Sequence, residues 1–355
     1  MIERDNLHYN FRAIDGYNKA LNFVMSPREP GKTTSMWLDK IYFPWKKNKR
    51  PWYFLVRNVN EINETLITSI SDTTINKFTD DNVQFEYKAG DFTNGIVDIK
   101  IKGEIFFRVV ALNCKLARIK KALLKNPAGI FIDEYIIDAL SGEKYLPQEA
   151  FKIMEAYTTW KREYKGKGML KMYICGNPYS LYNPLFVKWK VNINKLKRDS
   201  FYVGEDFVIH WAVLNPLLKE KLLKENPFYK FDEEYSNYAI EGQATQDANI
   251  KIKPFPNDYK LQFVFKYSNI FIGIYRNYNF EEMEDKFYVR QLRKEESNNK
   301  KILCLDFAEM IERSVLIGNE ERLYLAIFKN AIRNRQISFE NINLYYMIKE
   351  IYISL

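Results

Sequence analysis

Histidine and cysteine are scarce in this sequence. Its 355 residues include two histidines, His8 and His210, and three cysteines that lie far apart. So few histidines argue against a histidine-rich metal site and against most histidine-based catalytic triads. An odd number of widely spaced cysteines argues against a disulfide framework and a zinc ribbon, so a reducing, cytoplasmic compartment is expected.

Long apolar runs are also missing. No stretch approaches the roughly 18 uncharged apolar residues that a membrane helix needs, so no membrane partner is expected. The first residues, MIERDNLHYNFRAID, lack a basic segment followed by an apolar run, and we expect no signal peptide. The 46% of apolar and 28% of charged residues are typical of a globular chain with enough apolar material for two cores, which excludes global disorder.

The positive charge lies in the first half of the chain. The formal net charge is +9. Residues 1–190 hold 30 Lys and Arg against 21 Asp and Glu, whereas residues 191–355 hold 24 of each. A basic half favours a polyanionic partner such as nucleic acid or nucleotide, and an ordinary lysine-rich soluble protein is the alternative.

Short apolar runs alternate with helical stretches between residues 20 and 180. This alternation predicts an α/β fold with a mostly parallel sheet, because parallel strands are buried on both faces. From about residue 250, successive antiparallel strands and then a helical pair predict an α+β second domain. We expect domains at 1–190 and 251–355, joined by a linker or small helical connector at 191–250. The apolar runs are residues 21–25, 52–56, 129–132 and 172–175.

The segment LNFVMSPREPGKTT, residues 21–34, has the order of strand, tight loop, Gly-Lys-Thr and helix that a Walker A motif requires. Lys32 is expected to reach the β- and γ-phosphates of ATP, and the Thr33 hydroxyl to hold Mg²⁺. Gly31 allows the backbone amides to approach the phosphate. A plain strand–turn–helix corner is the alternative, and the first motif position is Ser rather than Gly. The candidate nucleotide-binding residues are Ser26, Arg28, Gly31, Lys32, Thr33 and Thr34.

Two further strand ends carry polar residues. The run GIFIDEY ends a strand with Asp133 and Glu134, and such strand ends point into the ligand crevice of α/β sheets. Asp133 is expected near Mg²⁺, and Glu134 is expected to polarise the attacking water. A helix N-terminal acid pair is the alternative. In MYICGNP, Asn177 either senses the γ-phosphate or only forms an Asn-Pro turn.

In order and spacing, these motifs resemble viral DNA-packaging ATPases of the large-terminase group, and most of all the small packaging ATPases of phi29-type tailed phages. The resemblance covers roughly residues 20–190 and is weaker around FVFKYSNIFIGIY. It implies an additional-strand (ASCE) P-loop ATPase domain, and Arg28 matches an arginine that the group carries before the motif glycine. The matching pieces are LNFVMSPREPGKTT, WYFLVRNVNEI, GIFIDEY and MYICGNPYSLYNPLF.

The resemblance implies an ATP-hydrolysing homopentameric ring that pushes double-stranded DNA into a procapsid. It would work in the host cell cytoplasm, at the portal vertex, with the portal and a packaging RNA as further partners. The family's trans-acting arginine matches Lys161 or Arg162, and Arg162 is favoured because a guanidinium suits a spread phosphoryl charge. A family lysine falls near Lys120. For each of these residues, the alternative interpretation is an ordinary basic side chain exposed to solvent.

The resemblance also implies a ribonuclease-H-like second domain. Active nucleases of this type place a metal-binding Asp on the first strand, but LQFVFKYSNIFIGIY has no carboxylate. Asp258, Asp285, Asp306 and Glu309 do not match the metal-binding positions. We therefore predict a vestigial domain that binds DNA, the portal or RNA without cleaving.

DNA gripping in such a ring is expected to be electrostatic and independent of sequence. The candidates are the cluster Lys46, Lys47, Lys49 and Arg50, or the loop between strands near 88–104. Three other functions stay open. They are another P-loop DNA translocase or helicase, a nucleic-acid-binding nuclease or scaffold with an inert P-loop, and a small-molecule P-loop kinase.

Overall fold

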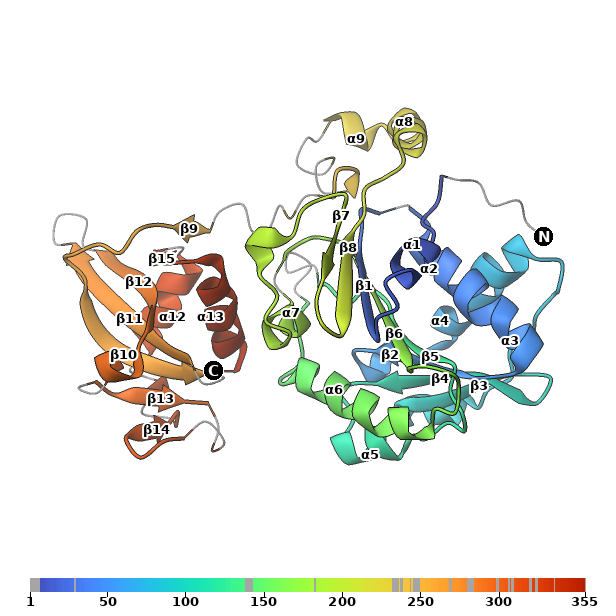
Figure 1. Cartoon of the computed structure of the whole chain (residues 1–355), viewed down its shortest axis with the longest axis horizontal. Coiled ribbons are helices and arrows are strands. Elements are labelled where there is room, and N and C mark those ends of the chain that lie inside the picture. The colour runs from blue at the N-terminus through green and yellow to red at the C-terminus, as the bar shows by residue number, and fades with distance from the viewer. Residues whose placement is uncertain are drawn as a thin grey trace. The chain divides into compact units, whose positions relative to one another are not determined.

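The chain divides into two compact units, Met1–Leu181 with Asn194–Gln246, and Tyr182–Ile193 with Asp247–Leu355 (Figure 1). No helix among the described residues is long and apolar enough to cross a membrane. The computed structural model describes residues 7–28, 30–137, 143–181, 183–231, 236, 239–242, 244, 250–267, 270–279, 284–297, 300–305, 307, 310–318, 321–322, 325–334 and 336–354.

An eight-stranded sheet forms the centre of the first unit, in the order β3-β4-β2-β5-β6-β1-β8-β7. The six inner strands are parallel, and β3 and β7 are antiparallel edges. One strand, β6, lies between β1 and β5, which confirms the predicted additional strand. The strands are β1 (Leu21–Met25), β2 (Trp52–Val56), β3 (Ile96–Ile101), β4 (Glu104–Ala111), β5 (Gly129–Ile132), β6 (Lys171–Gly176), β7 (Ser200–Val203) and β8 (Phe207–Trp211).

Helices pack on this sheet through aromatic side chains. Trp37 is buried against Phe54, Phe107 and Phe131, and Trp160 stacks on Tyr53 with ring centroids 3.8 Å apart. This packing fixes the helix that follows β1, which runs through α2, a π-helical segment and α3. The helical segments are α1 (Arg12–Asp15), α2 (Lys32–Ser35), the π-helix Met36–Tyr42, α3 (Phe43–Asn48), α4 (Glu64–Thr68), the π-helix Ser69–Asn76, α5 (Leu116–Lys121), α6 (Glu149–Trp160), α8 (Pro216–Glu225) and α9 (Phe228–Phe231).

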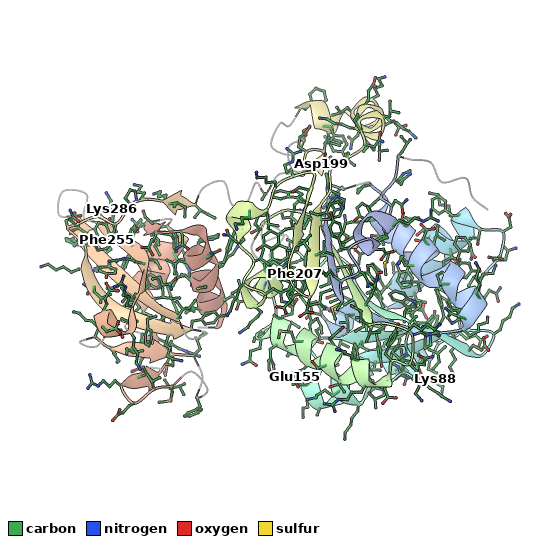
Figure 2. All side chains as sticks on the ribbon, in the orientation of Figure 1. Lys88, Glu155, Asp199, Phe207, Phe255 and Lys286 are labelled. Carbon is green, nitrogen blue, oxygen red and sulfur yellow. The ribbon has the colours of Figure 1, made fainter. Side chains whose placement is uncertain are left out.

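The segment expected to be a linker at 191–250 contributes two strands to the first sheet. β8 pairs with β1 from Leu21↔Phe207 to Met25↔Trp211, and Figure 2 marks Phe207 on this strand pair. The predicted connector is therefore wrong for residues 200–211. Val208 and Ile209 are fully buried. This apolar run is short and lies among lysines and prolines, so its hydrophobic pattern hardly indicated a strand.

The second unit has a seven-stranded sheet in the order β14-β13-β10-β11-β12-β15-β9. β10, β11 and β12 are antiparallel neighbours, and β13 and β14 run parallel to β10. The three antiparallel strands and the helices that follow confirm the predicted α+β second domain. Phe328 of α12 and Ile348 of α13 belong to the core that covers one face. The elements are α7 (Pro184–Lys188), β9 (Lys251–Ile252), β10 (Lys260–Tyr267), β11 (Ile270–Asn279), β12 (Glu284–Leu292), β13 (Ile302–Cys304), β14 (Ser314–Leu316), α12 (Ala326–Arg333), β15 (Ile337–Phe339) and α13 (Ile342–Ser354).

His210 on β8 connects the N-terminal segment to the first sheet. Its Nδ1 atom lies 2.9 Å from the Tyr9 hydroxyl, and its ring stacks on Phe201 at 3.9 Å between centroids. Burial lowers the pKa of His210 to about 4, and the charge of Asp199 opposes this shift. The imidazole is therefore neutral in the folded protein near pH 7.

Lowering the pH from 7 to 5 should destabilise the wild type more than a His210→Phe variant. In the unfolded chain His210 takes a proton near pH 6.5, whereas in the folded protein it does so only near pH 4. Its contribution to the free energy of unfolding is therefore fully present above pH 6.5 and is lost as the pH falls toward 4. Between pH 7 and pH 5, we expect the free energy of unfolding of the wild type to fall by on the order of 1–2 kcal/mol more than that of the variant. Urea titrations at both pH values measure it, and equal pH dependence in both proteins would contradict the prediction.

Candidate functional site

Polar residues follow three neighbouring strands where those strands end. Ser26 follows β1, Asn177 follows β6, and Asp133 follows β5. Because β5, β6 and β1 are adjacent and parallel, their carboxyl ends meet at one edge of the sheet. The structure therefore brings together the residues that the three motifs predicted.

The loop after β1 is held by backbone contacts. The amide of Ser26 donates to the Gly176 carbonyl at 3.2 Å, and the amide of Arg28 donates to the Ala239 carbonyl at 3.2 Å. The Ser26 side chain is fully buried, and its hydroxyl donates to the Pro27 carbonyl, so this residue shapes the base of the loop. Gly31 has φ of +69°, and a Cβ there would lie 2.9 Å from the His8 ring. Both facts favour glycine at the position before α2.

Lys32 begins α2 and is almost fully buried. Its Nζ atom donates to Asn177 Oδ1 at 2.6 Å and to the Pro27 carbonyl at 3.3 Å. Burial lowers the pKa of Lys32, and the charge of Asp133 opposes this shift. The ammonium is thus held by two neutral acceptors, which an anionic oxygen of a ligand can replace.

Thr33 and Asp133 are in direct contact, because Thr33 Oγ1 donates to Asp133 Oδ2 at 2.7 Å. Burial raises the pKa of Asp133, and the hydrogen bond from Thr33 and the charge of Lys32 oppose it. A hydroxyl beside a carboxylate is a donor set that suits Mg²⁺. Within the described part of the chain, no cluster of three His, Cys, Asp or Glu could hold a metal alone. A cation between Thr33 and Asp133 would therefore need oxygens from a ligand and water.

Glu134 has an unusual backbone for a non-glycine residue, with φ of +49°. Its amide donates to Asp133 Oδ1 at 3.0 Å, and its exposed side chain lines the cavity above the phosphate loop. Partial burial and then the nearby Asp133 carboxylate raise the pKa of Glu134. Strained positions of this kind are common at functional sites.

One cavity of about 2110 Å³ is lined by Lys32, Thr33, Glu134 and Asn177. It exceeds the ordinary small-molecule range of about 300–1,000 Å³ and continues along the helix after the phosphate loop. At its edge the Arg28 guanidinium donates to the Tyr179 hydroxyl at 2.7 Å, a pairing that no sequence signal indicated. The lining includes His8, Arg28, Gly31, Lys32, Thr33, Thr34, Lys46, Lys47, Glu134 and Asn177.

Four predicted residues do not line this cavity within the described part of the chain: Ser26, Asp133, Lys120 and Arg162. Ser26 is fully buried at the base of the loop, and Asp133 contacts Thr33, so both still belong to the site. Lys120 of α5 pairs with Glu155 of α6 at 2.6 Å (Glu155 is labelled in Figure 2). Arg162 is exposed in the short helix Lys161–Glu163 after α6. Nearby, the Lys165 amide donates to Asn126 Oδ1 at 3.0 Å, just before β5 begins. Arg162 therefore lies toward the amino ends of the parallel strands, whereas Asn177 lies at their carboxyl ends.

The basic cluster proposed for DNA gripping is largely engaged within the chain. Lys46 pairs with Asp81 at 2.7 Å, and Lys49 pairs with Glu104 at 3.3 Å. Arg50 donates to the carbonyls of Asn126 and Pro127 at 3.3 and 2.6 Å. The alternative loop near 88–104 is only in part a loop, because β3 takes up residues 96–101. The rest is the short helix Ala89–Asn94 and the turn that joins β3 to β4.

No family model and no curated protein matches the chain. Solved structures do match it, among them two that are covered over nearly their whole length as well. The Phi-28 gp11 DNA packaging motor has a TM-score of 0.68 and 16% identity, over 99% of this chain and 98% of that one. The bacteriophage Phi-29 viral genome packaging motor assembly has a TM-score of 0.62 and 18% identity, over 98% and 99%. The chain thus shares their fold. Its two sheets confirm the predicted α/β unit with a mostly parallel sheet and the predicted α+β second unit.

Proposed function

We propose that this chain is the ATP-hydrolysing subunit of a motor that moves double-stranded viral DNA into a procapsid. The observation that carries the proposal is the meeting of Lys32, Thr33 and Asp133 at the carboxyl edge of a parallel sheet, where Thr33 and Asp133 touch at 2.7 Å. The fold, shared with two DNA packaging motors, supports DNA as the partner.

In the proposed reaction, Lys32 leaves the Asn177 side chain and binds the β- and γ-phosphates of ATP. Thr33 and Asp133 would hold Mg²⁺, which neutralises phosphate charge when bound. Glu134 orients the attacking water and accepts its proton. Asn177, released from Lys32, can hydrogen-bond the γ-phosphate. Gly31 and the amides of residues 32–34 bind the phosphate oxygens, and Arg28 lies at the rim of the same cavity.

We further propose that the active form is a homopentameric ring. Arg162 is exposed and distant from the phosphate loop of its own chain, which suits a residue that acts on a neighbour's ATP. Lys161 is the alternative, and Lys120, paired with Glu155 in its own chain, is the weaker candidate. The ring would sit at the portal vertex in the host cytoplasm, with the portal and a packaging RNA as partners.

For the second unit we propose binding of DNA, the portal or RNA without cleavage. The central strand β10 has no carboxylate. Asp258 accepts a hydrogen bond from Asn277, and Asp285 pairs with Arg276 at 2.5 Å. The other two carboxylates considered, Asp306 and Glu309, lie outside the described residues.

DNA stimulation of ATP hydrolysis tests the proposal. Double-stranded DNA should raise the steady-state rate several-fold, and single-stranded DNA of the same length should raise it less. Failure to bind ATP would remove the nucleotide site and favour a scaffold with an inert P-loop. Hydrolysis that neither form of DNA affects would favour a small-molecule kinase or another non-motor ATPase.

A further inference from the structure

The guanidinium of Arg50 lies at the amino ends of three neighbouring strands, and the proposed reaction does not use it. Arg50 precedes β2, Asn126 and Pro127 precede β5, and residues 161–170 precede β6. Arg50 Nε donates to the Asn126 carbonyl at 3.3 Å, and Nη2 donates to the Pro127 carbonyl at 2.6 Å. The same guanidinium lies over the Tyr164 ring, 5.0 Å from its centroid. One side chain therefore joins the segments that lead into β2, β5 and β6.

Further contacts hold the segment before β6 in one shape. The Tyr164 hydroxyl donates to the Lys167 carbonyl at 3.1 Å, and the Lys165 amide donates to Asn126 Oδ1 at 3.0 Å. A Cβ at Gly166 would lie 2.5 Å from the Tyr164 hydroxyl oxygen and 2.9 Å from the guanidinium. Glycine at this position therefore allows the tyrosine and the guanidinium to pack closely against the backbone.

Arg162 lies between two aromatic anchors of this segment. On the α6 side, Trp160 is fully buried and stacks on Tyr53, with ring centroids 3.8 Å apart. On the other side is Tyr164, which the guanidinium of residue 50 covers. The helical turn Lys161–Glu163 between the anchors is therefore held at both of its ends.

The side chain of Arg162 contrasts with this fixed backbone. It is exposed, and within the described part of the chain it makes no hydrogen bond, ion pair or ring contact. Lys161, Lys165 and Lys167 are exposed as well, so the segment presents a strongly positive surface. A guanidinium on a fixed backbone and without an intramolecular partner suits a group that meets an anion of another molecule.

We propose that Arg50 is a positioning residue for Arg162. By joining Tyr164 to the carbonyls of residues 126 and 127, Arg50 fixes the turn Lys161–Glu163, which then presents the Arg162 guanidinium in one place to the ATP of a neighbouring copy. A guanidinium that is already in place loses less entropy when it binds a phosphoryl group. The inference rests on the proposed function, in which Arg162 acts in trans.

The Arg50→Lys variant tests this role in catalysis. It keeps the positive charge, but a lysine has a single nitrogen and cannot lie flat on the Tyr164 ring while it serves two carbonyls. We expect kcat for ATP hydrolysis to fall about 10-fold, because an arginine that acts in trans contributes more than this and its misplacement loses part of the effect. KM for ATP should stay within about twofold, because Lys32 and Thr33 are untouched. In an Arg162→Ala background, Arg50→Lys should lower kcat no further.

Arg333→Lys is a matched control. The guanidinium of Arg333 also contacts a tyrosine, since its Nε atom donates to the Tyr352 hydroxyl at 3.1 Å, but it belongs to the second unit. Its kcat should equal that of the wild type. A general loss of folding in the Arg50→Lys variant would change KM and the melting temperature together with kcat.

A spin label at residue 162 measures the positioning without ATP. The three native cysteines are buried, so an Arg162→Cys variant can be labelled selectively. The nitroxide spectrum of the free protein should show restricted motion, and adding Arg50→Lys should make this motion faster. A label on a Glu220→Cys variant, in the exposed part of α8, should move alike with and without Arg50→Lys.

The inference is overturned if the label at residue 162 moves alike with and without Arg50→Lys. It is also overturned if Arg50→Lys keeps the wild-type kcat while Arg162→Ala loses it, or if the two losses multiply. Wild-type protein that hydrolyses no ATP would instead remove the proposed function. The label needs neither ATP nor a ring, so it would still decide whether Arg50 holds the turn.

Discussion

Replacement of Glu134 by glutamine is expected to slow ATP hydrolysis at least about 100-fold while ATP affinity stays unchanged. Glutamine has the same shape, so it can occupy the cavity, but it cannot accept a proton from water. General-base catalysis is worth about 10²–10⁴ in rate. Binding should persist because Lys32 and the Thr33–Asp133 contact are untouched. Single-turnover hydrolysis and titration with a fluorescent nucleotide measure the two quantities.

Glu220→Gln is the matched control for that substitution. Glu220 lies on α8, pairs with Lys224 at 2.7 Å and does not line the cavity in the described part of the chain. This variant should hydrolyse ATP at the wild-type rate. Wild-type hydrolysis by the Glu134→Gln variant would show that another group activates the water.

The second large effect is expected for Lys32→Met, which should weaken ATP binding by about 100-fold or more. A charge-assisted hydrogen bond contributes about 1.5–3 kcal/mol, and Lys32 would make at least one such bond to each of two phosphates. Without nucleotide the same change should leave the free energy of unfolding unchanged or higher. The reason is that burial of the ammonium lowers the pKa of Lys32, so the folded protein carries a cost that methionine removes.

Calorimetric titration with ATP and urea unfolding without nucleotide test both statements. Lys40→Met is the control, because Lys40 lies on the same helix and its Nζ atom pairs with Asp15 at 2.6 Å. That variant should lose some stability and keep its ATP affinity. Normal ATP affinity in the Lys32→Met variant would remove Lys32 from the phosphate site.

The sequence predicted the central part of the site because strong local signals coincide there. Apolar strands at 21–25, 129–132 and 172–175 are easily recognised, and each is followed by a polar group. Parallel strands that lie side by side bring such groups to one edge of the sheet. Thr33 and Asp133 were therefore placed together although 100 residues separate them.

Contacts that depend on tertiary packing were not predictable in this way. Arg57 and Glu149 form a buried ion pair although they are 92 residues apart, and neither belongs to a motif with fixed spacing. Only the place of Arg57 directly after an apolar strand gave a signal, the same one that marked Asp133. The charged cluster at 46–50 was visible, but its ion pairs with Asp81 and Glu104 were not, because surface charges carry no periodic pattern.

Movement along double-stranded DNA is the central claim, and third-strand displacement tests it most directly. The substrate is a duplex whose two strands are cross-linked and which carries a triplex-forming oligonucleotide. The account predicts that the wild type, with ATP and Mg²⁺, displaces the third strand although the duplex cannot open, and that Glu134→Gln does not. Displacement only from duplexes that are free to separate would contradict the account and identify a helicase.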